Sequence, residues 1–322
     1  MDLEEQTLHY YLKAFSLIIT FLLIFFSSYF LYIVNKNLVL NYNPLVINKG
    51  EKIEDILNKN VNNFSKIEIG LIKYYAKIIN LINDNYIHYG EFNIKKKSSF
   101  IDLLSIISKP SNVFNKITIV EGWSKEKLNL ELSKYFDDYY PIPYNNIIAE
   151  TYFIQKNISF NSFILDLKKF KINYFKKYKN KKLFNNFNEN EIMIIGSLLE
   201  KEGLDYDDKR IISSVIINRL SKKMKLQIDA TVLFAITNGN FNLQRKLLLS
   251  DLKIDHPFNT YVYKGLPPEP ISYVGKKTID ILFENYSTDF LFYFFNNSLN
   301  RHIFSKTFKE HKRKLNEYRN KK

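Results

Sequence analysis

The hydrophobic positions of the chain follow three different patterns in succession. Residues 14–34 are uncharged and rich in Leu, Ile and Phe, and a helix of that length spans a bilayer core of roughly 30 Å. Residues 37–115 combine short apolar runs with helical spacing, and residues 116–322 combine longer helical periods with separate apolar strands. These patterns predict an α+β chain with a single N-terminal transmembrane helix, a small α/β domain and a larger α+β domain.

The first apolar run is predicted to remain in the protein as a membrane anchor. It is longer than the roughly 7–15 residues of a signal-peptide core, and Ser27 and Ser28 lie inside it instead of forming a cleavage site after it. Residues 1–13 form a short polar tail in which Lys13 is nearly the only basic residue. Since the basic side is a long domain, the charge pattern leaves the orientation open.

The small domain, residues 37–115, is predicted to alternate strands and helices. A hinge is expected at residues 109–112, because Pro110 disfavours a helical conformation for Lys109. The predicted elements are a strand at 45–47, a helix containing Ile53, Ile56 and Leu57, a helix at 66–81, a strand at 86–94 and a helix at 98–107.

The larger domain is predicted to begin with a strand of β-branched residues at 116–120. Ser124 follows as the N-cap of a helix. Residues 151–187 form a Lys- and Phe-rich segment that is predicted to be helical, and residues 291–295 are predicted to form a buried strand.

The stretch from residue 188 to residue 203 carries the clearest helix signal. Asn188 is predicted as its N-cap with Glu191 as the capping-box partner, and Gly203 marks its end. Its apolar positions recur at helical spacing and form one face. Glu200 lies one residue past that face, in the last turn, where partial burial and the helix dipole both raise the pKa of a carboxyl group. A general acid near neutral pH requires such a pKa.

Glu202 is the alternative acid in the same turn. Two residues along a helix rotate a side chain by about 200°, so Glu200 and Glu202 are predicted to face different directions. Glu202 is adjacent to Lys201 and Gly203 and is predicted to be a solvated helix end. We therefore predict Glu200 as the catalytic residue.

Polar residues after this helix have two interpretations. Asp207 or Asp208 is predicted to cap the next helix, because the spacing lacks the Gly and the distal Glu of a calcium loop. Gln227 and Asp229 alternate with apolar residues, which would place both side chains on one side of an extended segment. They are candidates for ligand contacts, and a helix cap is an equally good interpretation of Asp229.

Four sequence blocks resemble the endolytic murein transglycosylase (YceG-like) family. They are Ser197–Glu202, Val215–Leu220, Leu226–Val232 and Asn259–Ile271, which come in the order and approximate spacing of that family. One such block is a weak signal, but four in order are a strong one. The family commonly has Ala where this chain has Gly196, and a glycine there loosens the helix by roughly 0.5–1 kcal/mol.

The resemblance implies domains, an activity and a site. It implies a LysM-like domain at residues 37–115 and a YceG-like catalytic domain at residues 116–322. It implies a lyase that cleaves the MurNAc–GlcNAc bond of nascent peptidoglycan strands, leaves 1,6-anhydro-MurNAc ends and so terminates glycan elongation. One carboxylic acid suffices for this reaction, and we assign it to Glu200. The residues predicted to bind the glycan are Gln227, Asp229, Asn259 and Tyr261.

The resemblance also implies a location and partners. Residues 1–13 would lie in the cytoplasm, residues 14–34 in the inner membrane and the remainder in the periplasm. The implied partners are peptidoglycan strands, the inner membrane and cell-wall synthases. The alternative function is a non-catalytic, membrane-anchored scaffold that binds peptidoglycan.

Composition excludes other classes of function. The chain has no cysteine, which excludes disulfides and thiolate metal sites. Its net charge is +14, but the lysines are spread along the whole chain without a nucleic-acid-binding motif, so no nucleic acid is expected as a partner. No phosphate loop, catalytic triad or zinc motif is present in the sequence, so no cofactor or metal is expected. His302 and His311 are expected to be structural or to donate hydrogen bonds to substrate.

Overall fold

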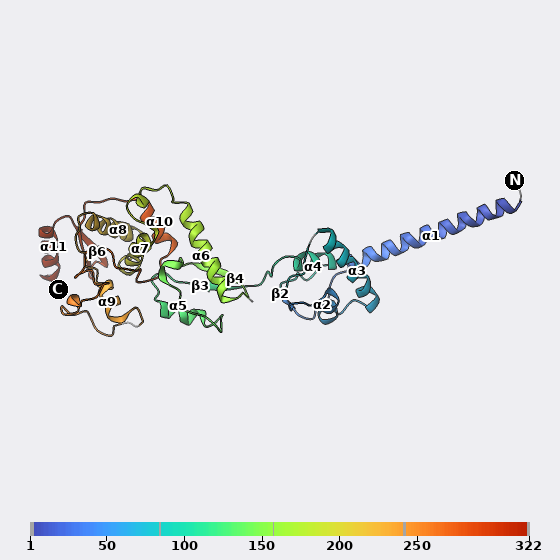
Figure 1. The fold of residues 1–322 in the computed structure, drawn as a ribbon, viewed down its shortest axis with the longest axis horizontal. Helices are drawn as coiled ribbons and strands as arrows, with labels where there is room; N and C mark the ends of the chain where they lie inside the picture. The colour runs from blue at the N-terminus through green and yellow to red at the C-terminus, as the bar shows by residue number, and fades with distance from the viewer. Residues whose placement is uncertain (1–2, 84, 157, 241–242, 321–322) are drawn as a thin grey trace. The chain divides into compact units, whose positions relative to one another are not determined.

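The computed structural model describes residues 3–83, 85–156, 158–240 and 243–320. The chain divides into two compact units, each with its own hydrophobic core. The first unit comprises residues 1–115 together with 155–157, and the second comprises residues 116–154 together with 158–322. In Figure 1 the first unit runs from blue to teal and the second from green to red.

The described residues of the first unit form helices and one pair of short strands. Strand β1 pairs antiparallel with β2, with Leu45 opposite Phe92 and Ile47 opposite Gly90. The strand predicted at 86–94 is therefore shorter than expected. The elements of this unit are α1 (Leu3–Asn35), β1 (Leu45–Ile47), α2 (Ile53–Asn60), α3 (Lys66–Asn83), β2 (Gly90–Phe92) and α4 (Phe100–Ile107).

The carboxyl end of α1 belongs to the core of the first unit. Ile33 has no exposed surface and packs with Leu38 among residues of α2, α3 and α4. Residues 8–35 of α1 are long and apolar enough to cross a membrane, and no other helix in the described ranges meets that criterion. The apolar run thus continues, without a break in the helix, into a folded domain.

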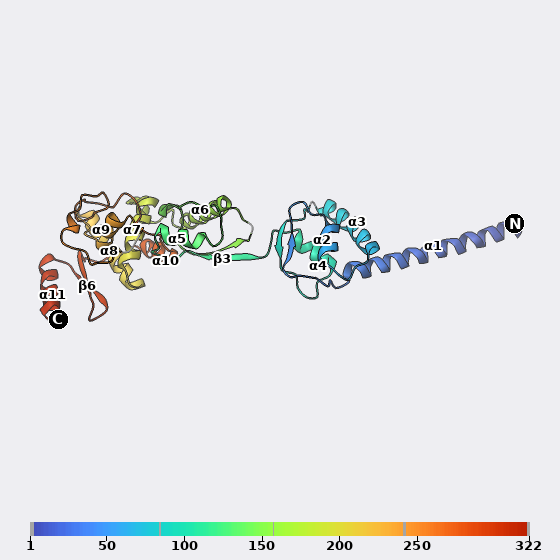
Figure 2. The same ribbon diagram turned by 90° about the horizontal axis from the view of Figure 1, so that it is seen from below.

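In the described residues, the second unit is built from helices and two two-stranded sheets, β3 with β4 and β5 with β6. Strands β3 and β4 are labelled in Figure 1, and β3 and β6 in Figure 2. Its first half contains β3 (Phe114–Thr118), α5 (Lys125–Leu132), the 3₁₀ turn η1 (Tyr144–Asn146), β4 (Thr151–Gln155), α6 (Phe160–Lys176) and η2 (Lys182–Asn185). Its second half contains α7 (Glu189–Glu202), α8 (Tyr206–Ser221), α9 (Asp229–Thr237), η3 (Asp251–Lys253), α10 (Lys276–Phe283), β5 (Phe292–Asn296), β6 (Arg301–Ser305) and α11 (Phe308–Asn320).

Helix α7 is the central element of the second unit. The predicted capping box is present, because Asn188 Oδ1 accepts from the N–H of Glu191 and the Glu191 carboxylate accepts from the N–H of Asn188. The helix ends at Gly203, as predicted. Residues 192–199 are all buried, since α8, α9 and α10 pack around the helix. The sequence predicted one apolar face, whereas the helix is enclosed on every side.

An extended segment, residues 271–275, runs along α7. The N–H of Ile271 donates to Ser197 Oγ at 3.0 Å, and Ser272 Oγ donates to the carbonyl oxygen of Ser197 at 3.2 Å. The close approach requires a small residue on the helix, because a Cβ on Gly196 would lie 2.7 Å from Val274 Cγ1. Gly196 is therefore a packing requirement in this chain.

The β5–β6 hairpin meets α8 at His302, which lies beside Asp208, and at Phe292, whose ring lies beside Arg219. Phe295 pairs with His302, and Asn296 pairs with Arg301 to close the turn. The turn lacks glycine, and Asn300 takes the left-handed conformation with φ +47°, which asparagine tolerates better than most residues. Strand β5 falls in the region predicted as a buried strand, but all of its residues except Asn296 are only half-buried.

Two local predictions are wrong. Residues 151–155 form strand β4 beside β3, with the hydroxyls of Thr118 and Thr151 3.1 Å apart, where a helical segment was expected. Asp205 caps α8 by accepting from the N–H of Asp208 at 2.9 Å. The predicted caps, Asp207 and Asp208, lie instead inside the first turn.

We predict that Gly196→Ala destabilises the protein, although alanine favours helix. The added methyl group would overlap Val274, and overpacking a core costs about 1–3 kcal/mol, against a helix-propensity gain of about 0.5–1 kcal/mol. Thermal and urea unfolding of the single and double variants measure the change in the free energy of unfolding. Gly196→Ala combined with Val274→Ala should be less destabilised than the sum of the two single changes. Additive changes, or a more stable Gly196→Ala protein, would contradict the proposed packing.

Candidate active site

The last turn of α7 carries two glutamates that have different neighbours. Glu200 faces α8 and the start of α10, whereas Glu202 faces the β5–β6 hairpin and the start of α9. This divergence agrees with the rotation expected for two residues of a helix. The two carboxyl groups therefore belong to different sites.

Glu200 is enclosed by protein hydrogen-bond donors. Only 2% of its side chain is exposed. One carboxylate oxygen accepts from Lys209 Nζ at 2.5 Å, and the other accepts from the N–H of Gly275 at 3.0 Å. Lys209 also donates to the hydroxyl of Thr278 at 3.1 Å. Both oxygens of Glu200 are thus used to link α7, α8 and the start of α10, which is the geometry of a structural ion pair.

Glu202 has a different environment. Its Oε2 accepts from the hydroxyl of Tyr293 at 3.1 Å. Burial raises the pKa of the Glu202 carboxyl, and the negative charge of Asp229 raises it further. Hydrogen bonds from Tyr293 and from the N–H of Ala230, together with the nearby His302, oppose that shift in pKa. The prediction that Glu202 is a solvated helix end is therefore wrong.

Tyr293 and His302 reach this site from facing strands of the hairpin. Their rings meet edge to face with centroids 5.3 Å apart. His302 is only 9% exposed, and its Nδ1 lies 2.9 Å from Oδ2 of Asp208 on α8. Burial and the neighbouring charge of Glu202 raise the pKa of Tyr293 far above its ordinary value, so its hydroxyl stays a neutral donor. Of the two histidines expected to be structural or substrate-facing, His302 supports this site.

Arg219 attaches the hairpin to α8. Its Nε donates to the carbonyl oxygen of Leu291 at 2.6 Å, and its Nη1 donates to that of Leu226 at 2.6 Å. The neighbouring Asn218 donates to the carbonyl oxygen of Phe290 at 3.0 Å. These bonds fix the segment that leads into β5 and so hold Tyr293 against Glu202.

Asp229 and Tyr261 form a pair next to Glu202. Asp229 is the exposed first residue of α9, and its Oδ1 accepts from the hydroxyl of Tyr261 at 2.6 Å. Burial and the bond to Asp229 raise the pKa of Tyr261, and the charge of Glu202 adds to this. Two of the residues predicted to bind substrate are therefore brought together beside this carboxyl group.

Gln227 and Asn259 are placed differently from their predictions. Gln227 is exposed and has a left-handed backbone with φ +52°, so the segment before α9 is not extended and does not align it with Asp229. Asn259 has no exposed surface, and its Nδ2 donates to the carbonyl oxygens of Leu252 and Ile254. Asn259 therefore has a structural role in its loop, and its contact with substrate stays a prediction.

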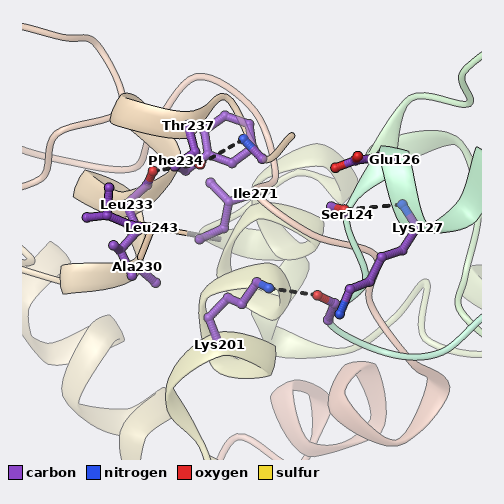
Figure 3. Close-up of a pocket in the computed structure, with 12 residues that line it drawn as sticks. Ser124, Glu126, Lys127, Lys201, Ala230, Leu233, Phe234, Thr237, Leu243 and Ile271 are labelled. Carbon is purple, nitrogen blue, oxygen red and sulfur yellow. Dashed lines mark hydrogen bonds between the residues drawn. The ribbon is translucent and has the colours of Figure 1, made fainter. Parts of the chain in front are cut away.

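A pocket of about 250 Å³ borders the first turn of α9. Ala230 lines the pocket and also provides the N–H that bonds to Glu202. Lys201 donates to the carbonyl oxygen of Gly122 at 2.7 Å, and Figure 3 shows Lys127 extending toward it along the same wall. Burial and the charge of Lys127 lower the pKa of Lys201. The apolar part of the lining comes from Ala230, Leu233, Phe234, Leu243 and Ile271.

This arrangement suits proton transfer by a carboxylic acid. A carboxyl group with a raised pKa keeps its proton to higher pH than usual, which suits a general acid. Glu202 has that property, and it is joined to the pocket through the N–H of Ala230. Within the described ranges, no group of three His, Cys, Asp or Glu side chains is arranged to hold a metal ion.

Sequence reasoning missed Tyr293, and it set Glu202 aside as a solvated helix end. Tyr293 lies 91 residues from Glu202 along the chain, and no local pattern signals that contact. The spacing of Glu200 and Glu202 predicted that they diverge, but it did not say which of the two is paired with a lysine. The sequence does contain the lysine that pairs with Glu200. It is Lys209, nine residues later, on the next predicted helix.

Comparison with known proteins relates residues 45–317 to the YceG-like family model. The chain is 37% identical over 145 residues to an endolytic murein transglycosylase of Bacillus subtilis, covering 45% of this chain and 39% of the relative. It is 25% identical over 334 residues to an endolytic murein transglycosylase of Streptococcus pneumoniae, covering 87% of this chain and 59% of the relative. The chain thus spans about two fifths to three fifths of the length of these curated relatives.

A solved structure shows the same fold. The crystal structure of a YceG-like protein from Listeria monocytogenes matches with a TM-score of 0.54 and 23% identity, covering 84% of this chain and 97% of that one. The family match takes in both units of the chain and all four sequence blocks that carried the resemblance. The chain therefore belongs to the YceG-like family.

Proposed function

We propose that this protein is an endolytic lytic transglycosylase of peptidoglycan, with Glu202 as its catalytic acid. The single observation that carries the proposal is the half-buried Glu202 carboxyl, which Tyr293 and the N–H of Ala230 hold near Asp229 and whose pKa burial raises. Ala230 also lines the pocket. The names of the Bacillus and Streptococcus relatives supply the reaction class. The assignment moves the acid from Glu200 to Glu202, because both oxygens of Glu200 are already bonded to protein donors.

Glu202 would serve in both steps of the reaction. In the first step its proton passes to the glycosidic oxygen between MurNAc and GlcNAc as the C1–O bond breaks, and the positive charge that develops on the sugar lies near Asp229. In the second step the C6 hydroxyl of the same MurNAc attacks C1, and its proton returns to Glu202. The products are a 1,6-anhydro-MurNAc end and a GlcNAc hydroxyl. The acid is regenerated and no water is consumed.

The remaining assignments follow the same proposal. Residues 37–115 would be the LysM-like domain and residues 116–322 the catalytic domain. Helix α1 would span the inner membrane with the short tail in the cytoplasm, which places the catalytic domain in the periplasm near newly made strands. Cleavage there would terminate glycan elongation, and cell-wall synthases are the expected partners.

We expect Glu202→Gln to abolish cleavage and Glu200→Gln to retain it. A general acid contributes about 10²–10⁴-fold to rate, and glutamine cannot donate the proton. Glu200→Gln should instead lower the unfolding temperature, because it removes the charge that Lys209 pairs with. The full chain and both variants are incubated with peptidoglycan strands, and the new ends are identified by mass spectrometry.

The products separate the possible outcomes. Anhydro ends are lighter than hydrolysed ends by the mass of one water. Their formation by the wild type and Glu200→Gln alone supports the proposal. If Glu200→Gln folds but does not cleave, while Glu202→Gln still cleaves, the catalytic role would return to Glu200. Reducing ends would indicate a hydrolase, and binding of strands without any cleavage would indicate a peptidoglycan-binding scaffold.

The pH dependence of cleavage should show a basic limb set by Glu202. Because the pKa of Glu202 is raised, its protonated form persists above the usual range of a carboxyl group and is lost as the pH rises through that value. The Tyr293 hydroxyl lowers this pKa, so Tyr293→Phe should move the basic limb of kcat/KM to higher pH. An unchanged limb in an active Tyr293→Phe protein, or a shift to lower pH, would exclude Glu202 as the titrating acid.

A further inference from the structure

One helix of the first unit exposes a continuous apolar stripe. On α3, six large apolar side chains are exposed, with exposed fractions between 39% and 83%. They recur every three or four residues, which places them on one face of the helix. The stripe consists of Ile67, Leu71, Tyr74, Ile78, Leu81 and Ile82. Single exposed apolar residues need no explanation, but a contiguous apolar face on a folded protein marks an interaction surface.

The stripe is separate from the face by which α3 joins its own domain. Ile69, Ile72 and Ala76 are buried in the core of the first unit. Lys66, Lys73 and Lys77 are exposed and share a third face of the helix, with Lys73 paired to Glu54 at 2.5 Å. An apolar face bordered by lysines is the composition of helices that lie in a membrane interface.

The position of α3 beside the membrane-spanning candidate indicates what covers the stripe. Tyr75 of α3 meets Phe30 of α1 with ring centroids 5.4 Å apart, and α3 lies beside the domain end of α1 in both Figure 1 and Figure 2. On a helical wheel Tyr75 lies between the buried face of α3 and the stripe, so the stripe adjoins the side on which α1 packs.

The length of α1 leaves little room between the bilayer and the domain. Its 28-residue apolar segment is about 42 Å long at 1.5 Å per residue, compared with a hydrocarbon core of roughly 30 Å. Residues 14–34 alone cover that core, so the excess lies largely before Ala14. Ile33, in the last turn of the predicted span, is already buried in the first unit. If α1 spans a bilayer, the first unit therefore begins directly at its surface, where lipid is the nearest apolar partner.

We propose that α3 lies in the lipid–water interface, with its apolar stripe in contact with the bilayer that α1 spans. This rests on the proposed membrane span and not on the proposed reaction. The lysines beside the stripe face the headgroups, and the first unit is held by two helices instead of one. That attachment fixes the height and the rotation of the first unit above the membrane.

The absence of native cysteine allows a direct test in the full chain. Single cysteines replace Ile78 on the stripe, its neighbour Lys77 as the matched control, and Leu22 inside the span. Each is labelled with an environment-sensitive fluorophore after reconstitution into vesicles of zwitterionic and anionic phospholipids, with lipid-attached quenchers. We expect the labels of Leu22→Cys and Ile78→Cys to emit at shorter wavelength and to be quenched, and that of Lys77→Cys to stay water-exposed.

The outcomes separate the two proposals about the membrane. A quenched Leu22 label with an Ile78 label as exposed as that of Lys77 would overturn the interfacial position of α3 alone. An Ile78 label that emits at shorter wavelength without quenching would mean a protein partner, such as a second copy of the chain, and would also overturn it. An unquenched Leu22 label would overturn the span and the position of α3 together. None of these readouts depends on peptidoglycan cleavage.

Discussion

The close packing of residues 271–275 along α7 is the constraint on which the candidate site depends. Hydrogen bonds to Ser197 and the missing side chain at Gly196 let the segment approach the helix, and the N–H of Gly275 then meets Glu200. These contacts fix the rotation of α7 about its axis. Once Glu200 is turned toward Gly275 and Lys209, the helical repeat turns Glu202 toward the hairpin and α9.

The two glutamates show that neighbouring charges and hydrogen-bond donors decide the role of an enclosed carboxyl group. Glu200 has an ammonium group and a backbone donor on its two oxygens, so its charge contributes to structure. Glu202 has neutral donors and a second negative charge nearby, so burial dominates and its pKa rises. The charge and the number of the surrounding donors, and not enclosure alone, therefore set the pKa of a carboxyl group.

Much of the local structure could be predicted from sequence, because caps and apolar spacing act within a few residues. The capping box of Asn188, the end of α7 at Gly203 and the Ser124 cap are present as expected. The site could not be predicted in the same way. Lys209 and Tyr293 reach the two glutamates through tertiary packing, and the left-handed backbone of Gln227 and the burial of Asn259 have no local signature.

Asp229 connects the resting site to the proposed reaction. Its negative charge raises the pKa of Glu202, and in the proposed reaction the same charge would favour a positive sugar ring once the proton has left. Tyr261 holds Asp229 in place with a phenol whose raised pKa keeps it a donor. In the proposed reaction, one fixed carboxylate would thus influence both steps without taking up the proton.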